Sequence, residues 1–309
     1  MLSPKMKLIS LSAVFLSLAA CAGVFADEPV RILTINVRTA AANDGENGWL
    51  HRKKFVTALL AGGNYDFIGT QETLVHPNKE WNQMKDIAAG LPEYGVLGRS
   101  RDKTPDSGET NALFYKKERW QPDTADKGTF WLSGTPEIPG SKTDPKAGCP
   151  RIVTFGLFHE LKEGKPSGRK IYVYNTHYDH RSEEARQRGA KQVMDSIAGR
   201  KEKDVPAAVM GDLNCGENSP AIRYMQGEPM TLDGEKITPP CRLTDTFRAV
   251  NPDAENVGTY HGFLQPHKDK IDFIFISAPL KTISSQIIRT QREGRYPTDH
   301  FPVEAVIAL

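Results

Sequence analysis

Six short stretches of this 309-residue chain, most of them apolar and strand-like, end in or contain an amide, an imidazole or a carboxylate. An apolar run that stops at such a group is typical of a buried strand presenting a reactive side chain at its end. Six unrelated turns are a poor explanation of this pattern, so we expect the polar ends to meet in one cleft. The stretches are residues 31–36, 67–72, 170–177, 206–214, 271–276 and 297–302.

The fourth stretch is the most informative, because two polar side chains follow its apolar part directly. Residues 206–210 lead into Gly211, Asp212, Leu213 and Asn214. Asp212 is suited to orient or deprotonate a water molecule. Asn214, two residues further along an extended chain, would lie on the same face and donate to an oxyanion. A turn in which both side chains bond to their own backbone explains the same residues, and this stretch alone does not separate the two interpretations.

Taken in order, the polar motifs resemble those of the endonuclease/exonuclease/phosphatase superfamily, the DNase I-like proteins. The resemblance extends from about Arg31 to Leu309, and its specificity comes from the order of the motifs. Three longer runs, residues 128–133, 150–154 and 294–303, are similar to an exported bacterial branch of that superfamily. The matching motifs are Asn36, Gln71-Glu72, Asn175-Thr176-His177, Gly211-Asp212-Leu213-Asn214, Ile271-Asp272 and Thr298-Asp299-His300.

The order of the expected elements indicates an α/β (α+β) layered domain. Strands predominate without a regular alternation of strand and helix, and a few amphipathic helices interrupt them. The resemblance makes this expectation specific. It implies a four-layer α/β/β/α sandwich, in which two packed β-sheets are flanked by helices and the polar strand ends meet at one edge.

Local patterns predict three helices, one hairpin and three less regular segments. The helices span residues 49–61, 78–89 and 182–198, and the hairpin pairs residues 151–159 with 169–175. The less regular segments are a Pro- and Gly-rich surface excursion at residues 121–149, a flexible polar loop at 101–110, and a weak strand at 243–250. Glu109, at the end of that loop, is expected in solvent, with a position facing the cleft as the alternative.

Hydrolysis of a phosphate ester, the activity that the resemblance implies, needs an activated water, neutralisation of the phosphoryl oxygens and help for the leaving oxygen. By the resemblance, Asp212 orients or deprotonates the water and Asn214 helps to hold the phosphoryl group. Asp272 pairs with His300, which keeps that imidazole oriented and positive, and His177 contacts the phosphate or protonates the leaving oxygen. A purely structural Asp–His pair stays open as the alternative for the histidines.

Three oxygen-bearing side chains, Asn36, Glu72 and Asp299, are the expected metal ligands. Glu72 directly follows a buried strand, where a carboxylate costs desolvation free energy unless it is paired or bound to a cation. Oxygen ligands without cysteine suit Mg²⁺, with Mn²⁺ and Ca²⁺ as alternatives, and they argue against a zinc–thiolate site.

The residues expected to bind substrate lie outside this catalytic set. Arg38 comes two residues after Asn36, so a continuing strand would point its guanidinium into the same cleft, where it suits phosphate or carboxylate. A packing role for the tryptophans and a surface ion pair for Arg52 explain the same residues equally well. The four further candidates for the wall of a small pocket are Trp49, Arg52, Trp131 and His261.

Residues 1–26 have the features of an export signal, with two lysines, a long apolar run and then small residues. We expect cleavage before Asp27, which leaves residues 27–309 as one catalytic domain in the periplasm or outside the cell. The segment around Cys21 also resembles a lipoprotein box, so acylation of Cys21 is the alternative. No stretch after the signal is long and apolar enough to predict a membrane span.

Export would change both the charge and the cysteine chemistry of the chain. Loss of Lys5 and Lys7 lowers the basic residues from 40 to 38, equal to the 38 acidic residues. Nucleic-acid binders commonly carry a basic excess, so the neutral total favours a small substrate. Cys149, Cys215 and Cys241 would remain in an oxidising compartment, and Cys215 with Cys241 is the disulfide to test first.

The sequence therefore predicts an exported, metal-dependent phosphoesterase, active as a monomer, that hydrolyses a small phosphodiester or phosphomonoester by attack of water. Two alternatives stay open. A secreted DNA or RNA endonuclease is disfavoured by the neutral charge and by the lack of an aromatic and basic tract. A catalytically silent binding module on the same fold is disfavoured because every motif position that can be matched keeps a competent residue.

Overall fold

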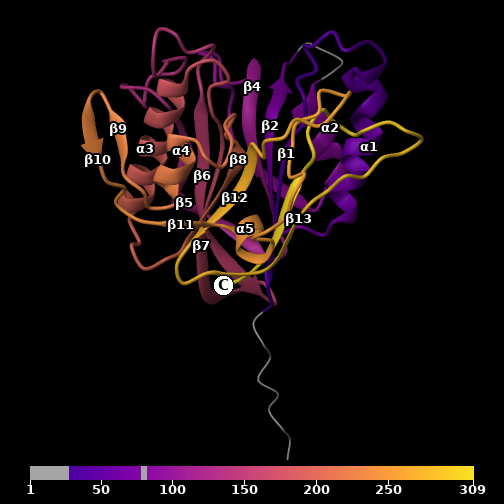
Figure 1. Cartoon of the computed structure of the whole chain (residues 1–309). Helices are drawn as coiled ribbons and strands as arrows, with labels where there is room; N and C mark the ends of the chain where they lie inside the picture. The colour runs from indigo at the N-terminus through magenta and orange to yellow at the C-terminus, as the bar shows by residue number, and fades with distance from the viewer. Residues whose placement is uncertain (1–27, 78–81) are drawn as a thin grey trace, which may run out of the picture.

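A computed structural model describes residues 28–77 and 82–309, which form two packed β-sheets with helices on their outer faces (Figure 1). This arrangement confirms the expected four-layer α/β/β/α sandwich. The expected signal peptide and its Cys21 lie outside the described residues, as do residues 78–81 at the start of an expected helix.

The first sheet contains six strands and is covered by two helices. In chain order the strands are β1 (Val30–Asn36), β2 (Phe67–Val75), β3 (Tyr94–Leu97), β4 (Gly108–Lys116), β13 (Lys281–Ile287) and β14 (Val303–Ala308). They lie side by side in the order β13, β14, β1, β2, β4, β3, and β1 and β2 run parallel while the other neighbours are antiparallel. The short η1 (Gly45–Asn47) precedes α1 (Trp49–Gly62), and α1 and α2 (Gln83–Gly90) cover the outer face.

The second sheet also contains six strands. They are β5 (Trp120–Trp131), β6 (Ile152–Lys162), β7 (Lys165–His177), β8 (Ala207–Asp212), β11 (Leu243–Asp245) and β12 (Asp272–Ser277), arranged as β11, β12, β8, β7, β6, β5. Helices α3 (Glu183–Gly199) and α4 (Pro220–Met225) cover its outer face, beside the hairpin of β9 (Met230–Leu232) and β10 (Glu235–Ile237). The short α5 (Thr246–Val250) completes the set, and within the described ranges no helix has the length and apolar character needed to cross a membrane.

Side-chain alternation along each inner strand decides which residues lie between the sheets. In β8, Ala208 and Met210 pack into the core between the two sheets, whereas Ala207 and Val209 pack toward α3 and α4. Because alternate residues of a strand share a face, Asp212 continues the series of Ala208 and Met210. Its carboxylate therefore lies at the end of the layer between the sheets.

Toward this end, the layer between the sheets changes from apolar to amide and then to ionisable side chains. Gln71 donates through Nε2 to Thr34 Oγ1 at 3.0 Å and to Asn175 Oδ1 at 2.7 Å, so the two buried amides are joined by a hydrogen bond. One alternation further along the same strands, or along their neighbours, lie Asn36, His177, Asp212 and Asp272. The apolar core therefore ends in a layer of hydrogen-bonded amides, and the ionisable groups lie directly beyond that layer.

Two expectations of local structure are wrong. Residues 121–131 are not part of an irregular excursion, because they pair with β6 as the edge strand β5, and a shift of register between Pro122 and Lys127 accommodates the proline. Residues 243–250 form only three residues of strand before α5 begins. Asp245 caps that helix by accepting from the backbone N–H of Phe247, which ends the strand.

The expected disulfide between Cys215 and Cys241 is not formed. Cys215 is buried in the core between the second sheet and its helices, and Cys241 packs against the same core, but both thiols are free. Cys149 is also free and lies at the polar end of the sandwich. The described part of the chain is therefore held by packing and hydrogen bonds without a disulfide.

Candidate active site

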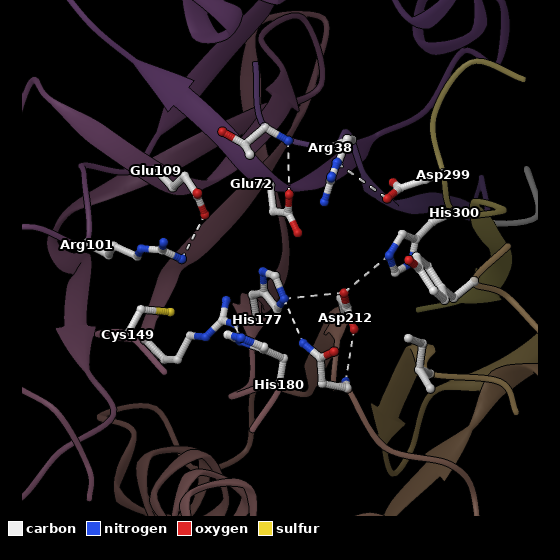
Figure 2. A pocket seen from close by; sticks show the side chains of 15 residues that line it. Arg38, Glu72, Arg101, Glu109, Cys149, His177, His180, Asp212, Asp299 and His300 are labelled. Atoms are coloured by element: carbon white, nitrogen blue, oxygen red, sulfur yellow. Dashed lines mark hydrogen bonds and ion pairs between the residues drawn. The ribbon is translucent and has the colours of Figure 1, made fainter. Parts of the chain in front are cut away.

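A pocket of about 360 Å³ opens at the ionisable end of the layer between the sheets (Figure 2). Strand ends and loops of both sheets contribute its lining, so the pocket is where the two sheets separate. The residues that line it are Arg38, Thr39, Glu72, Arg101, Glu109, Cys149, Arg151, His177, His180, Asp212, Asn214, Tyr260, Ile271, Asp299 and His300.

Strand register places three of the predicted catalytic groups in one row. The parallel pairing of β7 with β8 sets His177 opposite Asp212, and the antiparallel pairing of β12 with β8 sets Asp272 opposite the same residue. Directly opposed side chains on one face of a sheet are close neighbours. The sequence-predicted residues His177, Asp212 and Asp272 are therefore brought together by the sheet itself.

Asp212 is the central residue of the pocket. Its Oδ2 accepts from Asn36 Nδ2 at 3.0 Å and lies 3.3 Å from His177 Nε2 and 3.7 Å from His300 Nε2. Its Oδ1 accepts from the backbone N–H of Asn214 at 2.9 Å. Asp212 therefore bonds to the backbone of the turn and also lines the pocket, so both interpretations of this stretch hold. Burial raises the pKa of Asp212 to about 7, and the nearby Asp272 adds to this effect. The carboxylate is thus able to gain or lose a proton near neutral pH.

His300 carries the positive charge beside Asp212. Its Nδ1 donates to Asp272 Oδ2 at 2.9 Å. Burial by itself would lower the pKa of His300, but the carboxylates of Asp272 and Asp212 outweigh burial and raise the pKa to about 10. The ring is therefore an imidazolium at neutral pH, held by Asp272 with its Nε2 toward Asp212.

His177 is neutral, in contrast to His300. The Nδ2 of Asn214 donates to the carbonyl of Tyr178 at 3.0 Å and lies 2.8 Å from His177 Nε2, so the ring nitrogen accepts from the amide. Burial, assisted by the positive charge of Arg151, lowers the pKa of His177 well below its ordinary value. Asn214 reaches this position through a left-handed backbone (φ 50°) and not, as expected, through an extended strand.

The predicted metal ligands Asn36 and Glu72 are joined by a hydrogen bond. Asn36 Nδ2 donates to Glu72 Oε1 at 3.0 Å as well as to Asp212, and Asn36 Oδ1 accepts from the backbone N–H of Arg38 at 2.9 Å. Glu72 Oε2 accepts from the backbone N–H of Thr39 at 2.9 Å. Glu72 has a left-handed backbone (φ 59°) at a shift of register in β2, and its side chain lines the pocket. A non-glycine residue in this conformation is strained, which is common at functional sites.

The acids of the pocket fit a hard divalent cation. Burial would raise the pKa of Glu72, but hydrogen bonds from Asn36 and Thr39 more than offset burial and lower it, so the group stays ionised. Burial raises the pKa of Asp299, which lines the same pocket. Oxygen donors of this kind match Mg²⁺ or Mn²⁺. Asp272 and His300 also approach Asp212 closely, but His300 is committed to Asp272, so we assign these three to charge pairing and not to a ligand set.

Arg38 lines the pocket as expected, although by a different route. It follows the end of β1 with a left-handed backbone (φ 55°), so strand alternation does not place it. Asp44 binds its guanidinium with two hydrogen bonds of 2.9 and 3.0 Å, and Asp299 lies 3.7 Å from its Nε. Arg38 therefore supplies a fixed positive charge beside Asp299.

The four other candidates for the pocket wall do not line the pocket, and this expectation is corrected. Trp49 is buried in the core beneath α1 and donates through Nε1 to Asp86 at 2.8 Å. Trp131 is also buried, and its Nε1 donates to the backbone carbonyl of Arg101 at 2.6 Å. Both indoles therefore serve packing and hydrogen bonding inside the fold, because burial offers each ring apolar contacts and one polar partner.

Arg52 and His261 are likewise inside the fold. Arg52 Nη1 donates to the carbonyls of Val37 at 3.0 Å and Pro297 at 2.8 Å, which ties the end of β1 to the segment that carries Asp299. The ring of His261 is buried, with its centroid 4.2 Å from that of Tyr296 and 4.4 Å from that of Phe301. These residues support the pocket from behind.

Several pocket residues were missed or misjudged from the sequence. Glu109 is not in solvent: it lies in β4 and pairs with Arg101 at 2.7 Å. The two-residue period from the inward-facing Leu113 back to Glu109 is a signal that would have found it. His180, which the sequence motifs did not single out, bonds to Arg151 at 3.0 Å. The other residues that the sequence did not assign to the pocket lie in loops or directly before a strand; they are Thr39, Arg101, Cys149, Arg151, Tyr260 and Ile271.

A sequence model described as the Endonuclease/Exonuclease/phosphatase family matches residues 33–300. No curated protein matches the chain in sequence. Among solved structures, an endonuclease/exonuclease/phosphatase from Bacteroides vulgatus is 30% identical at a TM-score of 0.77, covering 91% of this chain and 99% of its own. A mannosyl-6-phosphatase from Bacteroides thetaiotaomicron is 26% identical at a TM-score of 0.72, covering 91% and 100%.

A more distant structure shares the fold alone. D. rerio TDP2, complexed with a single-strand DNA product, is 15% identical at a TM-score of 0.66, covering 92% of this chain and 100% of its own. The family match spans most of the chain, and the described strands, helices and pocket agree with the fold that the motif order implied. The chain belongs to the endonuclease/exonuclease/phosphatase family.

Proposed function

We propose that the protein is a metal-dependent phosphoesterase that hydrolyses a phosphate ester of a small molecule by attack of water. One observation carries the proposal: Asp212, a buried carboxylate with a pKa of about 7, lies between the imidazolium of His300 and the neutral ring of His177. An acid–base group, a fixed positive charge and a neutral hydrogen-bonding ring in one pocket are the groups that hydrolysis of a phosphate ester needs.

Glu72, with Asn36 and Asp299, would hold the metal ion. The ionised carboxylate of Glu72 and the crowding of buried acids around it support this assignment. When bound, Mg²⁺ or Mn²⁺ supplies neutralisation of the phosphoryl oxygens and orientation of the substrate.

The side chains of the pocket have separate roles in the proposed reaction. Asp212 orients the attacking water and takes its proton, while the water oxygen bonds to phosphorus and the ester P–O bond breaks. The imidazolium of His300, fixed by Asp272, opposes the negative charge that develops on the phosphoryl group. Asn214 and His177 lie on the other side of Asp212. From there they would contact the phosphoryl group and the leaving oxygen.

A small phosphomonoester is the favoured substrate. The pocket of about 360 Å³ is near the lower end of the range for ligand sites, ~300–1,000 Å³, and suits one compact ligand. The relative from Bacteroides thetaiotaomicron that is named a mannosyl-6-phosphatase supports a monoester in the same fold. The alternative is a secreted endonuclease, and the substrate assay must distinguish it from a phosphomonoesterase.

Purified protein with Mg²⁺ should be assayed against p-nitrophenyl phosphate, bis(p-nitrophenyl) phosphate and plasmid DNA. We expect turnover of the monoester, with less of the diester and no rapid cleavage of DNA. Rapid, salt-sensitive cleavage of DNA without monoester turnover would favour the nuclease. No turnover of any of the three would favour a silent binding module.

Export belongs to the same proposal and rests on residues 1–26, with their lysines, apolar run and small residues. Protein isolated from the native host should lie outside the cytoplasm and begin near Asp27, which N-terminal sequencing measures. Palmitate labelling that is lost in Cys21→Ser would show a lipoprotein in place of a cleaved, unanchored chain.

A further inference from the structure

Four charged or imidazole side chains, together with Cys149, line the half of the pocket that faces away from His300, and none of the four has a role in the chemistry proposed above. Arg101 follows β3, Glu109 belongs to β4, Arg151 precedes β6 and His180 follows β7. Figure 2 shows Arg101 and Glu109 across the pocket from His300. We refer to these four residues as the distal wall.

Hydrogen bonds fix the distal wall before any ligand arrives. Arg101 Nη1 lies 2.7 Å from Glu109 Oε2, and the backbone N–H of Arg101 donates to the carbonyl of Glu109 at 2.8 Å. Trp131 holds the carbonyl of Arg101 from behind at 2.6 Å. Arg151 Nη2 lies 3.0 Å from His180 Nδ1. A surface ordered in this way loses little conformational entropy when it binds a ligand.

The charges of the distal wall cancel. Arg101 is matched by Glu109, and Arg151 lies 3.9 Å from the carboxylate of Asp179. The Nδ1 of His180 accepts from Arg151, so this ring is neutral, and burial together with the charge of Arg151 lowers the pKa of His180. A wall without excess positive charge is a poor site for a second phosphate, which needs unpaired cations.

The same wall is rich in both hydrogen-bond donors and acceptors. The guanidinium groups of Arg101 and Arg151 donate, the carboxylate of Glu109 accepts, and the imidazole of His180 can do either. A hydroxyl group donates one hydrogen bond and accepts others, so a set of hydroxyls is the neutral ligand that matches such a wall. An aromatic or aliphatic alcohol would displace water from the remaining donor and acceptor sites of these groups without replacing its hydrogen bonds, which costs binding free energy.

We propose that the distal wall binds the polyhydroxylated alcohol part of the substrate, which makes the substrate class the monophosphate of a sugar or a similar polyol. This inference rests on the proposed phosphoesterase function. The water oxygen bonds to phosphorus, the ester P–O bond breaks, and the leaving oxygen gains one proton in balance with the proton that Asp212 removes from the water. The products are the free polyol and inorganic phosphate.

A metal site is the competing explanation for part of this wall. Ligand atoms of Cys149, Asp179 and His180 lie within 4.8 Å of one another. However, the carboxylate of Asp179 already accepts hydrogen bonds from the backbone N–H groups of Gly148, Arg181 and Ser182. The guanidinium of Arg151 also lies against both Asp179 and His180, where it would repel a cation.

The test compares one variant on two kinds of phosphomonoester, using the full mature chain with Mg²⁺. Glu109→Gln removes the acceptor charge of the distal wall with little change of shape. We expect the KM for mannose 6-phosphate or glucose 6-phosphate to rise about tenfold or more, the scale of a lost hydrogen bond to a charged group. For p-nitrophenyl phosphate, whose alcohol lacks hydroxyl groups, we expect kcat/KM to change by less than about threefold.

The matched control is Glu217→Gln. Glu217 pairs with Arg248 at 2.7 Å, the same distance as Glu109 with Arg101, but it does not line the pocket. This variant should leave the kinetic constants for both kinds of substrate unchanged. Arg101→Lys, which keeps the charge and loses the planar fork, should raise the KM for the hexose phosphate in the same direction as Glu109→Gln.

Several results would overturn the inference. Turnover of p-nitrophenyl phosphate without turnover of any hexose phosphate would leave the proposed function standing and remove the sugar-binding role. An equal loss on both substrates in Glu109→Gln, or a preference for fructose 1,6-bisphosphate over the monophosphates, would do the same. Tight binding of Zn²⁺ that is lost in His180→Ala would assign that side chain to a metal. No turnover of any phosphate ester would instead refute the proposed function.

Discussion

The two ends of the sandwich both bury charged side chains, but they differ in how those charges are matched. At the end where β1, β2 and β7 begin, Arg119 lies 3.0 Å from Asp66 and 2.9 Å from Glu160, and Arg169 lies 2.9 Å from Glu160. Trp120 adds a hydrogen bond of 2.8 Å to Asp66. Each carboxylate of this cluster therefore meets a guanidinium and further donors, which offsets part of the cost of burial, and burial still raises the pKa of Asp66.

At the opposite end, where the same strands finish, acids exceed their partners. Asp212, Glu72 and Asp299 line one pocket, and burial raises the pKa of two of them. The nearest positive charges are His300, already committed to Asp272, and Arg38, already bound by Asp44. The difference indicates that the first end is built for stability, whereas the pocket keeps charge available for a cation and a phosphate ester.

The largest effect should come from Asp212→Asn, which removes the acid–base group and keeps its shape. We expect kcat to fall by about a hundredfold or more, because Asn cannot take a proton from water. The variant should be at least as resistant to denaturant as the wild type, because the substitution removes a buried charge beside Asp272. Steady-state kinetics and urea unfolding measure both. Unchanged turnover in a folded variant would contradict the catalytic role of Asp212 and, with it, the functional difference between the two ends.

Arg119→Met should have the reverse profile, with a large loss of stability and little loss of activity. The substitution leaves Asp66 and Glu160 with fewer cations, and breaking a buried ion pair costs ~3–5 kcal/mol in the free energy of unfolding. The control is Arg188→Met, whose partner Glu184 is exposed, and it should cost below ~1 kcal/mol. A stable Arg119→Met protein with reduced kcat/KM would contradict the structural role.

The smallest expected effect is that of Trp131→Phe, which keeps the buried ring and removes the hydrogen bond to the carbonyl of Arg101. Loss of one such bond is worth ~1 kcal/mol, so the KM for a hexose phosphate should rise about fivefold with kcat unchanged. The KM for p-nitrophenyl phosphate should not change, because the lost hydrogen bond orients Arg101, which this substrate does not need. A loss of kcat on both substrates would mean that the indole supports the whole pocket.

The fold and the centre of the site followed from regular patterns in the sequence. A two-residue period carries Ala208 and Met210 to Asp212, and the same rule carries Ile274 and Ile276 back to Asp272, so strand alternation places both carboxylates on the face between the sheets. The order of the motifs then identified the two-sheet sandwich.

The rest of the site depends on contacts that no local pattern encodes. Glu72 and Asn214 lie in the pocket through left-handed backbone positions, which the identity of a non-glycine residue does not reveal. Arg101 and His180 lie on loops whose course is set by distant partners. Tryptophan is a residue type that often stacks on ligands, and only tertiary packing shows that the ring of Trp131 is buried behind Arg101.

The most direct test of the central claim is isothermal titration calorimetry of Mg²⁺ into the metal-free wild-type protein and into Glu72→Gln. We expect saturable binding to the wild type and no detectable binding to the variant, because the substitution removes the ionised carboxylate that the other pocket residues orient. The hydrolysis of p-nitrophenyl phosphate should disappear with EDTA and return with Mg²⁺ or Mn²⁺. Equal binding of Mg²⁺ by both proteins, or full hydrolysis in EDTA, would contradict the account.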